Sequence, residues 1–282
     1  MEIIIAKTAG FCFGVKRAVK LAFNTEVEAH THTLGPIIHN DTVIKRLEDQ
    51  GITVIDAQAL DEKEAIDTLI IRAHGVSKAI YDKTEEKHIK VVDATCPYVK
   101  KIHRIVRDYS QKDYGVIIIG DTKHPEVEGI KGWVEGDSCV IKEASSINFT
   151  QLQKEQAYIA VAQTTYKKAV VDDILERLKE QGYEVTYLST ICNATTERQE
   201  EAQRISKKVE AMLVIGSPSS SNTQKLYEIC KNNCESTWCI NDASEINSDD
   251  LRDKQVIGIT AGASTPEDLI CDVTKRLQEI ML

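Results

Sequence analysis

The stretch VVDATCPYVKK, residues 91–101, joins an apolar run that predicts a β-strand to a run that predicts a helix. A single cysteine, Cys96, stands at the junction, and no other cysteine lies within forty residues of it. A disulfide or a local metal clip needs a second cysteine nearby. If Cys96 has a chemical role, its partners therefore come from distant parts of the chain.

The same arrangement recurs twice. Residues 2–12, EIIIAKTAGFC, end at Cys12, and residues 186–192, TYLSTIC, end at Cys192. Two other kinds of segment also occur three times in a constant order, which indicates an internal repeat. The first kind is GPIIHND (35–41), GDTKHPE (120–126) and GSPSSSN (216–222). The second kind is IIRAHGV (70–76), IAVAQTTY (159–166) and GITAGAST (258–265).

Short apolar runs alternate with amphipathic helical patterns, which predicts parallel sheets covered by helices. With the repeat, this gives an α/β fold of three similar lobes, each with a mostly parallel four-stranded sheet. The lobes are residues 14–96, residues 97–193, and residues 194–282 together with 1–13, the last closed by the N-terminal strand. Strands are expected near 31–34, 52–55, 68–72 and 89–93; near 115–119, 138–141, 157–162 and 184–188; and near 211–215, 236–240, 255–260 and 2–6.

Two helices show clear sequence signals. Residues 164–182 carry Val170, Ile174 and Leu178 at four-residue spacing, and Gly182 is a stop signal. Residues 264–280 begin with a serine that suits an N-cap, followed by acidic residues in the first turn. We therefore expect one helix over each range.

Ligands of parallel α/β sheets bind at the carboxyl ends of the strands. Pseudo-threefold packing of the lobes would bring Cys12, Cys96 and Cys192 to one axis, where three thiolates suit a metal. Structural zinc normally has four protein ligands, whereas three cysteines fit a [4Fe–4S] cluster with one iron free of protein ligands. That iron can act as a Lewis acid. A zinc–thiolate scaffold and three unrelated buried cysteines remain the alternatives.

Short polar side chains gather at the same strand ends, where backbone N–H groups are also free. They suit a phosphate or diphosphate, although plain helix capping explains any one of the serines. The set is His39, His74, Ser220, Ser221, Asn222 and Ser264.

Glu126 follows His124 in the sequence HPE. A carboxyl group near an anionic ligand has a raised pKa, so Glu126 is a candidate proton donor. The alternative is a first-turn glutamate favoured by the helix dipole. Thr164 and Thr165 are suited to relay a proton or to cap a helix that starts there.

The charge composition of the chain disfavours some classes of binding partner. The chain has 282 residues with 35 Lys and Arg against 44 Asp and Glu, a net charge of −9, which argues against nucleic acid or an anionic membrane as the main partner. The N-terminal run lacks the features of a signal peptide, so we expect a cytoplasmic protein.

The remaining cysteines and histidines receive no catalytic role. A second metal site at Cys230, Cys234 and Cys239 is disfavoured because no fourth ligand lies nearby. For two further cysteines and two histidines, the sequence pattern predicts only whether the side chain is buried or exposed. Cys139 and Cys271 are expected in the core, and His30 and His32 at the surface.

The motifs together resemble the 4-hydroxy-3-methylbut-2-enyl diphosphate reductase family, in order from Cys12 to Pro266. They are GFCFGV, RAHGV, DATCP, HPEVEG, QTT, ICNATTERQ, SSSN and TAGAST. The resemblance implies a trefoil of three α/β lobes around one [4Fe–4S] cluster held by Cys12, Cys96 and Cys192. It also implies a two-electron, two-proton reductive removal of the substrate hydroxyl, which gives isopentenyl and dimethylallyl diphosphates. This reaction is the last step of non-mevalonate isoprenoid biosynthesis.

The resemblance also assigns roles to single residues. The six polar residues at the strand ends would bind the diphosphate, His124 and Thr164 would flank the substrate alcohol, and Glu126 would deliver protons. Thr195 would assist near the cluster, and electrons would come from a ferredoxin or flavodoxin. Two other functions stay open at this point: a hydro-lyase with no net redox change, and an iron–sulfur sensor that binds a phosphorylated metabolite.

Overall fold

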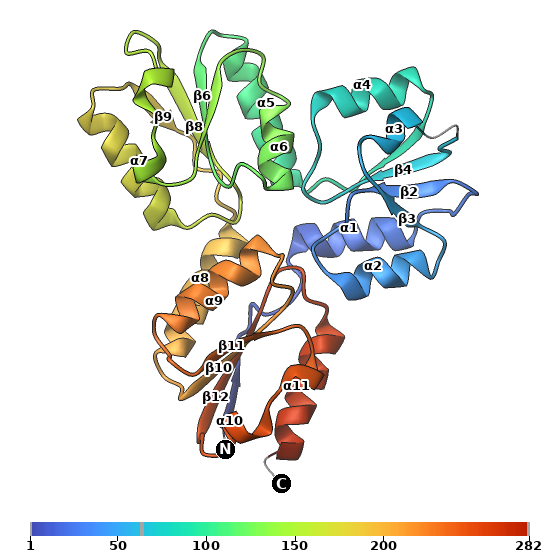
Figure 1. Ribbon diagram of the computed structural model, residues 1–282, viewed down its shortest axis with the longest axis vertical. Helices are drawn as coiled ribbons and strands as arrows, with labels where there is room; N and C mark the ends of the chain where they lie inside the picture. The colour runs from blue at the N-terminus through green and yellow to red at the C-terminus, as the bar shows by residue number, and fades with distance from the viewer. Residues whose placement is uncertain (1, 63–64, 281–282) are drawn as a thin grey trace. The chain divides into compact units, whose positions relative to one another are not determined.

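The computed structural model describes residues 2–62 and 65–280, which form three four-stranded sheets with helices around them (Figure 1). Every strand pairing within these sheets is parallel. The predicted α/β class with three four-stranded parallel sheets is therefore confirmed. The strands are β1 (Glu2–Ile5), β2 (Thr31–Leu34), β3 (Thr53–Ile55), β4 (Thr68–Ile71), β5 (Lys90–Asp93), β6 (Gly115–Ile119), β7 (Ser138–Ile141), β8 (Tyr158–Ala162), β9 (Val185–Tyr187), β10 (Ala211–Ile215), β11 (Thr237–Ile240) and β12 (Val256–Ala261).

Each strand is followed by a helix or a short helical turn that leads to the next strand. The α-helices are α1 (Phe13–Phe23), α2 (Asp41–Glu48), α3 (Ala59–Glu62), α4 (Lys78–Glu86), α5 (Pro97–Ser110), α6 (Pro125–Lys131), α7 (Lys168–Glu180), α8 (Asn193–Ser206), α9 (Ser221–Lys231), α10 (Ser248–Leu251) and α11 (Glu267–Ile280). Single 3₁₀ turns occur at 144–146, 149–151 and 243–245.

The three sheets share one topology. Their strand orders are β3-β2-β4-β5, β7-β6-β8-β9 and β11-β10-β12-β1, so the N-terminal strand β1 closes the third sheet by pairing with β12. Equivalent hydrogen bonds recur as well. Gly35 donates its N–H to the last residue of β3 at 2.7 Å, and Gly120 and Gly216 make the same bond to the last residues of β7 and β11 at 3.0 and 2.8 Å. The internal repeat is therefore structural.

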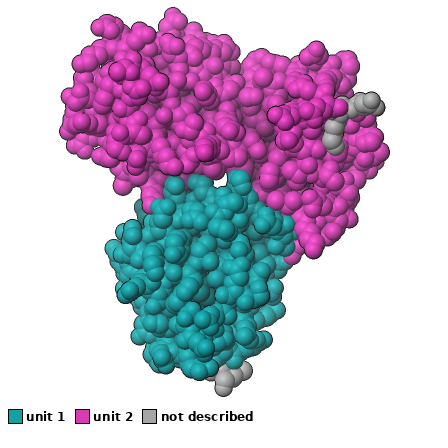
Figure 2. All heavy atoms as spheres, viewed as in Figure 1, with its two compact units in different colours: residues 1–16, 39–42, 193–282 teal, residues 17–38, 43–192 magenta. Residues whose placement is uncertain are grey.

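The chain divides into two compact units (Figure 2). One contains the third sheet and consists of the described residues within 1–16, 39–42 and 193–282. The other contains the first and second sheets and consists of the described residues within 17–38 and 43–192. The three lobe boundaries and their pseudo-threefold arrangement stay predictions.

Aromatic contacts join the first and second sheets within the larger unit. The Trp133 indole N–H donates to the Val76 carbonyl at 2.8 Å, and His103 stacks on Trp133 with ring centroids 5.3 Å apart. Burial lowers the pKa of His103 to about 4, so its ring is neutral at neutral pH.

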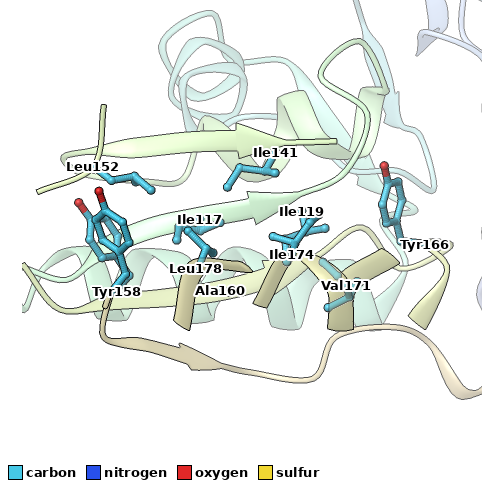
Figure 3. Close-up of a cluster of buried hydrophobic side chains, with 12 residues drawn as sticks. Ile117, Ile119, Ile141, Leu152, Tyr158, Ala160, Tyr166, Val171, Ile174 and Leu178 are labelled. Carbon is cyan, nitrogen blue, oxygen red and sulfur yellow. The ribbon is translucent and has the colours of Figure 1, made fainter. Parts of the chain in front are cut away.

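Both faces of the second sheet are covered, which explains the unbroken apolar run of β6. Alternate residues of a strand face opposite sides. Figure 3 shows Ile117 and Ile119 on the side of α7, where they pack with Ile174. On the other side Ile118 packs with Ile102 of α5. A parallel strand buried on both faces reads as a continuous apolar run rather than an alternating one.

Both predicted helices begin later than expected. Residues 163–166 form a turn closed by the Tyr166 N–H and the Gln163 carbonyl at 2.9 Å, so α7 begins at Lys168. Val171 is fully buried, and Val170 is half-buried against the same core cluster. Ser264 is not an N-cap. It lies in a turn closed by the Thr265 N–H and the Gly262 carbonyl, and α11 begins only at Glu267.

The predicted exposure of His32 and the predicted burial of Cys271 are both wrong. His32 is buried in β2, where its Nδ1 lies 2.7 Å from the Thr53 hydroxyl, because every residue of that strand is covered. His30 is exposed as predicted. Cys271 is exposed on α11, and Cys139 is half-buried at the edge of the core.

Gly75 permits the close approach of the first and second sheets. Its φ is +73°, and a Cβ there would lie 2.6 Å from Cε1 of His103. Gly75→Ala is expected to lower the free energy of unfolding by about 2–4 kcal/mol, from backbone strain together with overpacking. Gly182 is the matched control, because its φ is +78° but a Cβ there would meet no atom within 4 Å. Urea unfolding that gives equal losses for both alanine variants would contradict this explanation.

Candidate active site

The three predicted ligand cysteines occupy equivalent places. Each follows the edge strand β1, β5 or β9 and stands directly before α1, α5 or α8, and each is half-buried and forms no disulfide with a described residue. Their backbone N–H groups bind the turn that follows the neighbouring strand. The acceptors are the carbonyls of Ala263 for Cys12 at 3.4 Å, Ala73 for Cys96 at 2.9 Å and Thr164 for Cys192 at 3.0 Å.

These positions fit the residues of an iron–sulfur site. A cysteine between an edge strand and the next helix offers a soft ligand atom, and its backbone is fixed while its side chain is not committed to a disulfide. Cys12 belongs to the smaller unit, and Cys96 and Cys192 belong to the larger. Their common ligand role remains a prediction.

The buried carboxyl group of Glu126 is bound to Thr164. Its two oxygens accept the Thr164 N–H at 2.6 Å and the Thr164 hydroxyl at 2.7 Å. Burial raises the pKa of Glu126 from its ordinary value of 4.5 to about 7, although the two bonds from Thr164 oppose the shift. The acid is therefore poised to exchange a proton near neutral pH.

His124 is the N-cap of α6 and is fixed by the same segment. Its Nδ1 accepts the Glu126 N–H at 3.2 Å, so in the neutral ring the proton is on Nε2. The ring lies edge-on to His74 with centroids 5.4 Å apart. Together with the Cys192 N–H, which binds the Thr164 carbonyl, these bonds form one chain that runs from a predicted ligand to a predicted acid and then to a histidine.

The predicted diphosphate ligands of the third sheet come together at the start of α9. Ser220 is the N-cap and accepts the Thr223 N–H at 3.4 Å, which agrees with the capping alternative. Ser264 donates its hydroxyl to the Ser220 hydroxyl at 3.3 Å, and Ser221 is half-buried beside it.

Asn222 is the most informative residue of this group. Its side chain is 4% exposed, and neither its Oδ1 nor its Nδ2 has a hydrogen-bond partner among the described residues. Buried polar atoms without partners are costly in a folded protein. A bound ligand would supply the missing hydrogen bonds.

Two other predicted site residues lie at or just before the start of a helix. His39 is half-buried, two residues before α2, and Thr195 is buried in the first turn of α8. Cys234 donates its thiol to the Val209 carbonyl and Cys239 to the Gly216 carbonyl, while Cys230 packs in a hydrophobic cluster.

Two arginines outside the predicted set of site residues contact the segments leading to the cysteines. Arg198 binds the carbonyls of Thr8 and Gly10, and Arg17 binds the carbonyl of Thr95. In the sequence, each arginine follows a predicted ligand cysteine at similar spacing. Arg17 stands five residues after Cys12, and Arg198 stands six residues after Cys192.

A buried acid with a raised pKa, paired histidines and three cysteines beyond the carboxyl ends of parallel strands define an α/β enzyme. The family model described as LytB protein matches residues 3–278. The chain belongs to the LytB protein family, and the resemblance found in its motifs is confirmed.

Named relatives are similar over nearly their whole length. The 4-hydroxy-3-methylbut-2-enyl diphosphate reductase of Caldanaerobacter subterraneus is 46% identical over 99% of this chain and 98% of its own. That of Clostridioides difficile is 41% identical over 99% of this chain and 100% of its own.

Two solved structures share the fold. One is (E)-4-hydroxy-3-methyl-but-2-enyl diphosphate reductase, the terminal enzyme of the non-mevalonate pathway, with a TM-score of 0.72, 38% identity, and coverage of 99% of this chain and 100% of that one. The other, from Plasmodium falciparum, has a TM-score of 0.88, 28% identity, and coverage of 99% and 87%. In the part of the chain that the structure describes, no helix has the length and apolarity needed to cross a bilayer.

Proposed function

We propose that the protein removes the hydroxyl group of 4-hydroxy-3-methylbut-2-enyl diphosphate with two electrons and two protons, releasing water. The products are isopentenyl and dimethylallyl diphosphates, which makes the reaction the terminal step of non-mevalonate isoprenoid biosynthesis. The observation that carries this proposal is the LytB family match over residues 3–278, with relatives of that name aligned over nearly the whole of both chains.

The proposed cofactor is one [4Fe–4S] cluster held by Cys12, Cys96 and Cys192. Its support is the equivalent position of the three cysteines, each between an edge strand and the helix that follows it and each fixed through its backbone N–H. When bound, such a cluster supplies electrons and one iron without a protein ligand, which acts as a Lewis acid.

The proposed substrate contacts are histidine, serine and asparagine side chains. The diphosphate would be bound by His39, His74, Ser220, Ser221, Asn222 and Ser264. The unpartnered amide of Asn222 and the neighbouring hydroxyls of Ser220 and Ser264 support this assignment. An anion at the N-terminus of α9 would also be favoured by the helix dipole.

Glu126 would supply the protons. Hydroxide is a poor leaving group, so the C–O bond breaks more easily when the oxygen receives a proton. With a pKa of about 7, Glu126 is protonated in a large fraction of molecules at neutral pH. Protonated Glu126 donates to the Thr164 hydroxyl, whose own hydrogen is then free to bind the substrate oxygen.

The other residues near the reacting end would orient it. His124 offers Nε2–H toward the substrate alcohol because its Nδ1 is held by the Glu126 N–H. Thr195 would assist near the cysteines from the first turn of α8. The second proton goes to the allylic carbon, and a ferredoxin or flavodoxin would supply the two electrons.

The experiment is an anaerobic assay of reconstituted protein with the hydroxylated allylic diphosphate. We expect both isoprenoid diphosphates to appear only when a low-potential reductant is present, with two electrons consumed per product. Conversion without any reductant would instead favour a hydro-lyase. A colourless protein that contains zinc and no iron would contradict the proposed cofactor, since a [4Fe–4S] protein is brown and absorbs near ~400 nm.

A further inference from the structure

A buried arginine fixes the segment that leads to Cys12. This segment, Thr8–Gly10, is called here the Cys12 turn. Arg198 of α8 is 4% exposed. It donates its Nε–H to the Thr8 carbonyl at 2.8 Å and an Nη2–H to the Gly10 carbonyl at 2.7 Å, and Nη2 also contacts the Thr8 carbonyl. The guanidinium thus bridges two carbonyls just before the cysteine, as its planar fork allows.

The Cys12 turn is held on its other sides as well. Glu201, nearly one helical turn after Arg198, accepts both the N–H and the hydroxyl of Thr8 at 2.8 Å. Gly10 has φ of +94°, and a Cβ there would lie 3.1 Å from Cδ1 of Ile270. The conformation before Cys12 is therefore set by α8 and by the packing of α11.

A second arginine makes similar contacts before Cys96. The segment Asp93–Thr95 is called here the Cys96 turn. Arg17 of α1 donates to the Thr95 carbonyl at 3.2 Å and to the Asp93 carbonyl at 3.5 Å. The Asp93 carboxylate accepts the Thr95 N–H at 2.9 Å and pairs with Lys100 at 2.5 Å.

The segment before Cys192 is fixed differently. The Thr190 hydroxyl accepts the Ala162 N–H at 2.7 Å and donates to the Ala162 carbonyl at 2.8 Å. Two of the three cysteines thus follow a turn bound by a guanidinium, and each of these arginines lies on the helix that follows another of the three cysteines.

We propose that Arg198 and Arg17 are positioning residues that hold the Cys12 and Cys96 turns in their ligand-ready conformation and place permanent positive charge at the carbonyl groups of these turns. This inference rests on the proposed function for the identity of the cofactor. A turn that is already ordered binds a metal without paying the entropy of ordering. A guanidinium stays charged at all physiological pH values, so it favours the more negative, reduced state of the cluster and raises its reduction potential.

The test compares Arg198→Gln and Arg198→Lys with the wild type in three measurements. The first is the rate at which a small alkylating reagent modifies Cys12 in the cluster-free protein, with the exposed Cys271 as the internal reference. The second is the rate of iron loss to a chelator from the holoprotein. The third is the reduction potential of the cluster. Arg276→Gln is the matched control, because this exposed arginine of α11 pairs only with Glu279 in the described contacts.

For Arg198→Gln we expect faster Cys12 alkylation, iron loss faster by about tenfold, and a lower potential. Arg198→Lys keeps the charge but lacks the planar fork, so its potential should stay near that of the wild type while iron loss remains fast. The Arg276→Gln control should match the wild type throughout. Wild-type alkylation, iron retention and potential in Arg198→Gln would overturn the proposal.

Arg17 keeps the inference testable if the Arg198 variants do not fold. Arg17 is only half-buried, and Arg17→Gln should accelerate alkylation of Cys96 and lower the potential, whereas Arg17→Lys should restore the potential alone. If Arg17→Gln changed neither the rate of Cys96 alkylation nor the reduction potential, the proposal for this turn would be overturned. Alkylation of the cluster-free protein does not depend on turnover. A wild type that fails to convert the allylic diphosphate would therefore contradict the proposed function without deciding the role of the arginines.

Discussion

Glu126→Gln is expected to lower kcat by about 10²–10⁴-fold while the fold, iron content and substrate affinity are retained. Glutamine has the same shape, and its Oε1 still accepts the Thr164 N–H that now lies 2.6 Å from the carboxyl group. What would be lost is the proton that Glu126 is proposed to pass through the Thr164 hydroxyl. Glu128→Gln is the matched control, since it removes an exposed carboxyl group from the same helix α6. A Glu126→Gln enzyme with near-normal kcat would remove Glu126 from the acid role.

The same substitution has an effect on stability that depends on pH. The pKa of Glu126 is about 7 in the folded protein, against an ordinary value of 4.5. The folded state binds the proton of Glu126 more tightly than the unfolded state does. The resulting contribution to the free energy of unfolding is complete below pH 4.5 and is lost as the pH rises through 7. The loss is about 3 kcal/mol. Glu126→Gln should therefore gain stability relative to the wild type at pH 8 and not at pH 4.5, as urea unfolding of the cluster-free protein would show. An unchanged difference between the two pH values would contradict a protonated, buried Glu126.

Cys96→Ser is expected to lose the cluster and with it all reductive turnover. Serine is nearly isosteric, and the Cys96 N–H bond to the Ala73 carbonyl is a backbone bond, so the turn itself should persist. The loss would therefore report the missing thiolate, which iron–sulfur clusters require. Iron analysis after anaerobic reconstitution checks this, with Cys271→Ser as the control because that thiol is exposed on α11. A full complement of iron in Cys96→Ser would contradict the ligand assignment.

The strands are predictable from this sequence because parallel strands covered on both faces are short continuous apolar runs. VIIIG at 116–120 and AYIAVA at 157–162 correspond to β6 and β8 within one or two residues. The repeat then predicts four equivalent strands in each lobe, since equivalent segments fold in the same way. The place of β1 in the third sheet follows from the same argument, because the third lobe otherwise lacks one strand, whereas its pairing with β12 is known only from the structure.

The starts of two helices are not predictable from periodicity, because turns at strand ends use the same residue types as helix caps. Thr164 and Ser264 look like capping residues in the sequence. Their atoms are engaged elsewhere, Thr164 with Glu126 and Ser264 with Ser220, so the helices begin three or four residues later. The sequence of a short strand does not show whether one face or both faces of it are covered. For this reason the sequence wrongly predicts His32 at the surface.

The candidate site residues follow from motifs, but their physical state requires the structure. The sequence places Glu126 next to His124, yet only the fold shows that Thr164, 38 residues away, binds both carboxyl oxygens. The unpartnered amide of Asn222 and the contacts of Arg198 across 190 residues to Thr8 are likewise long-range facts. Such contacts depend on side-chain packing that no local pattern records.

Three cysteine thiolates are proposed to hold a four-iron cluster in which one iron has no protein ligand. Mössbauer spectroscopy of protein reconstituted anaerobically with ⁵⁷Fe, before and after addition of the allylic diphosphate, tests this proposal. We expect four irons and four sulfides per chain, as the cluster formula requires, and a substrate-induced change confined to one iron. Fewer irons, bound zinc, or a spectrum that substrate leaves unchanged would contradict it.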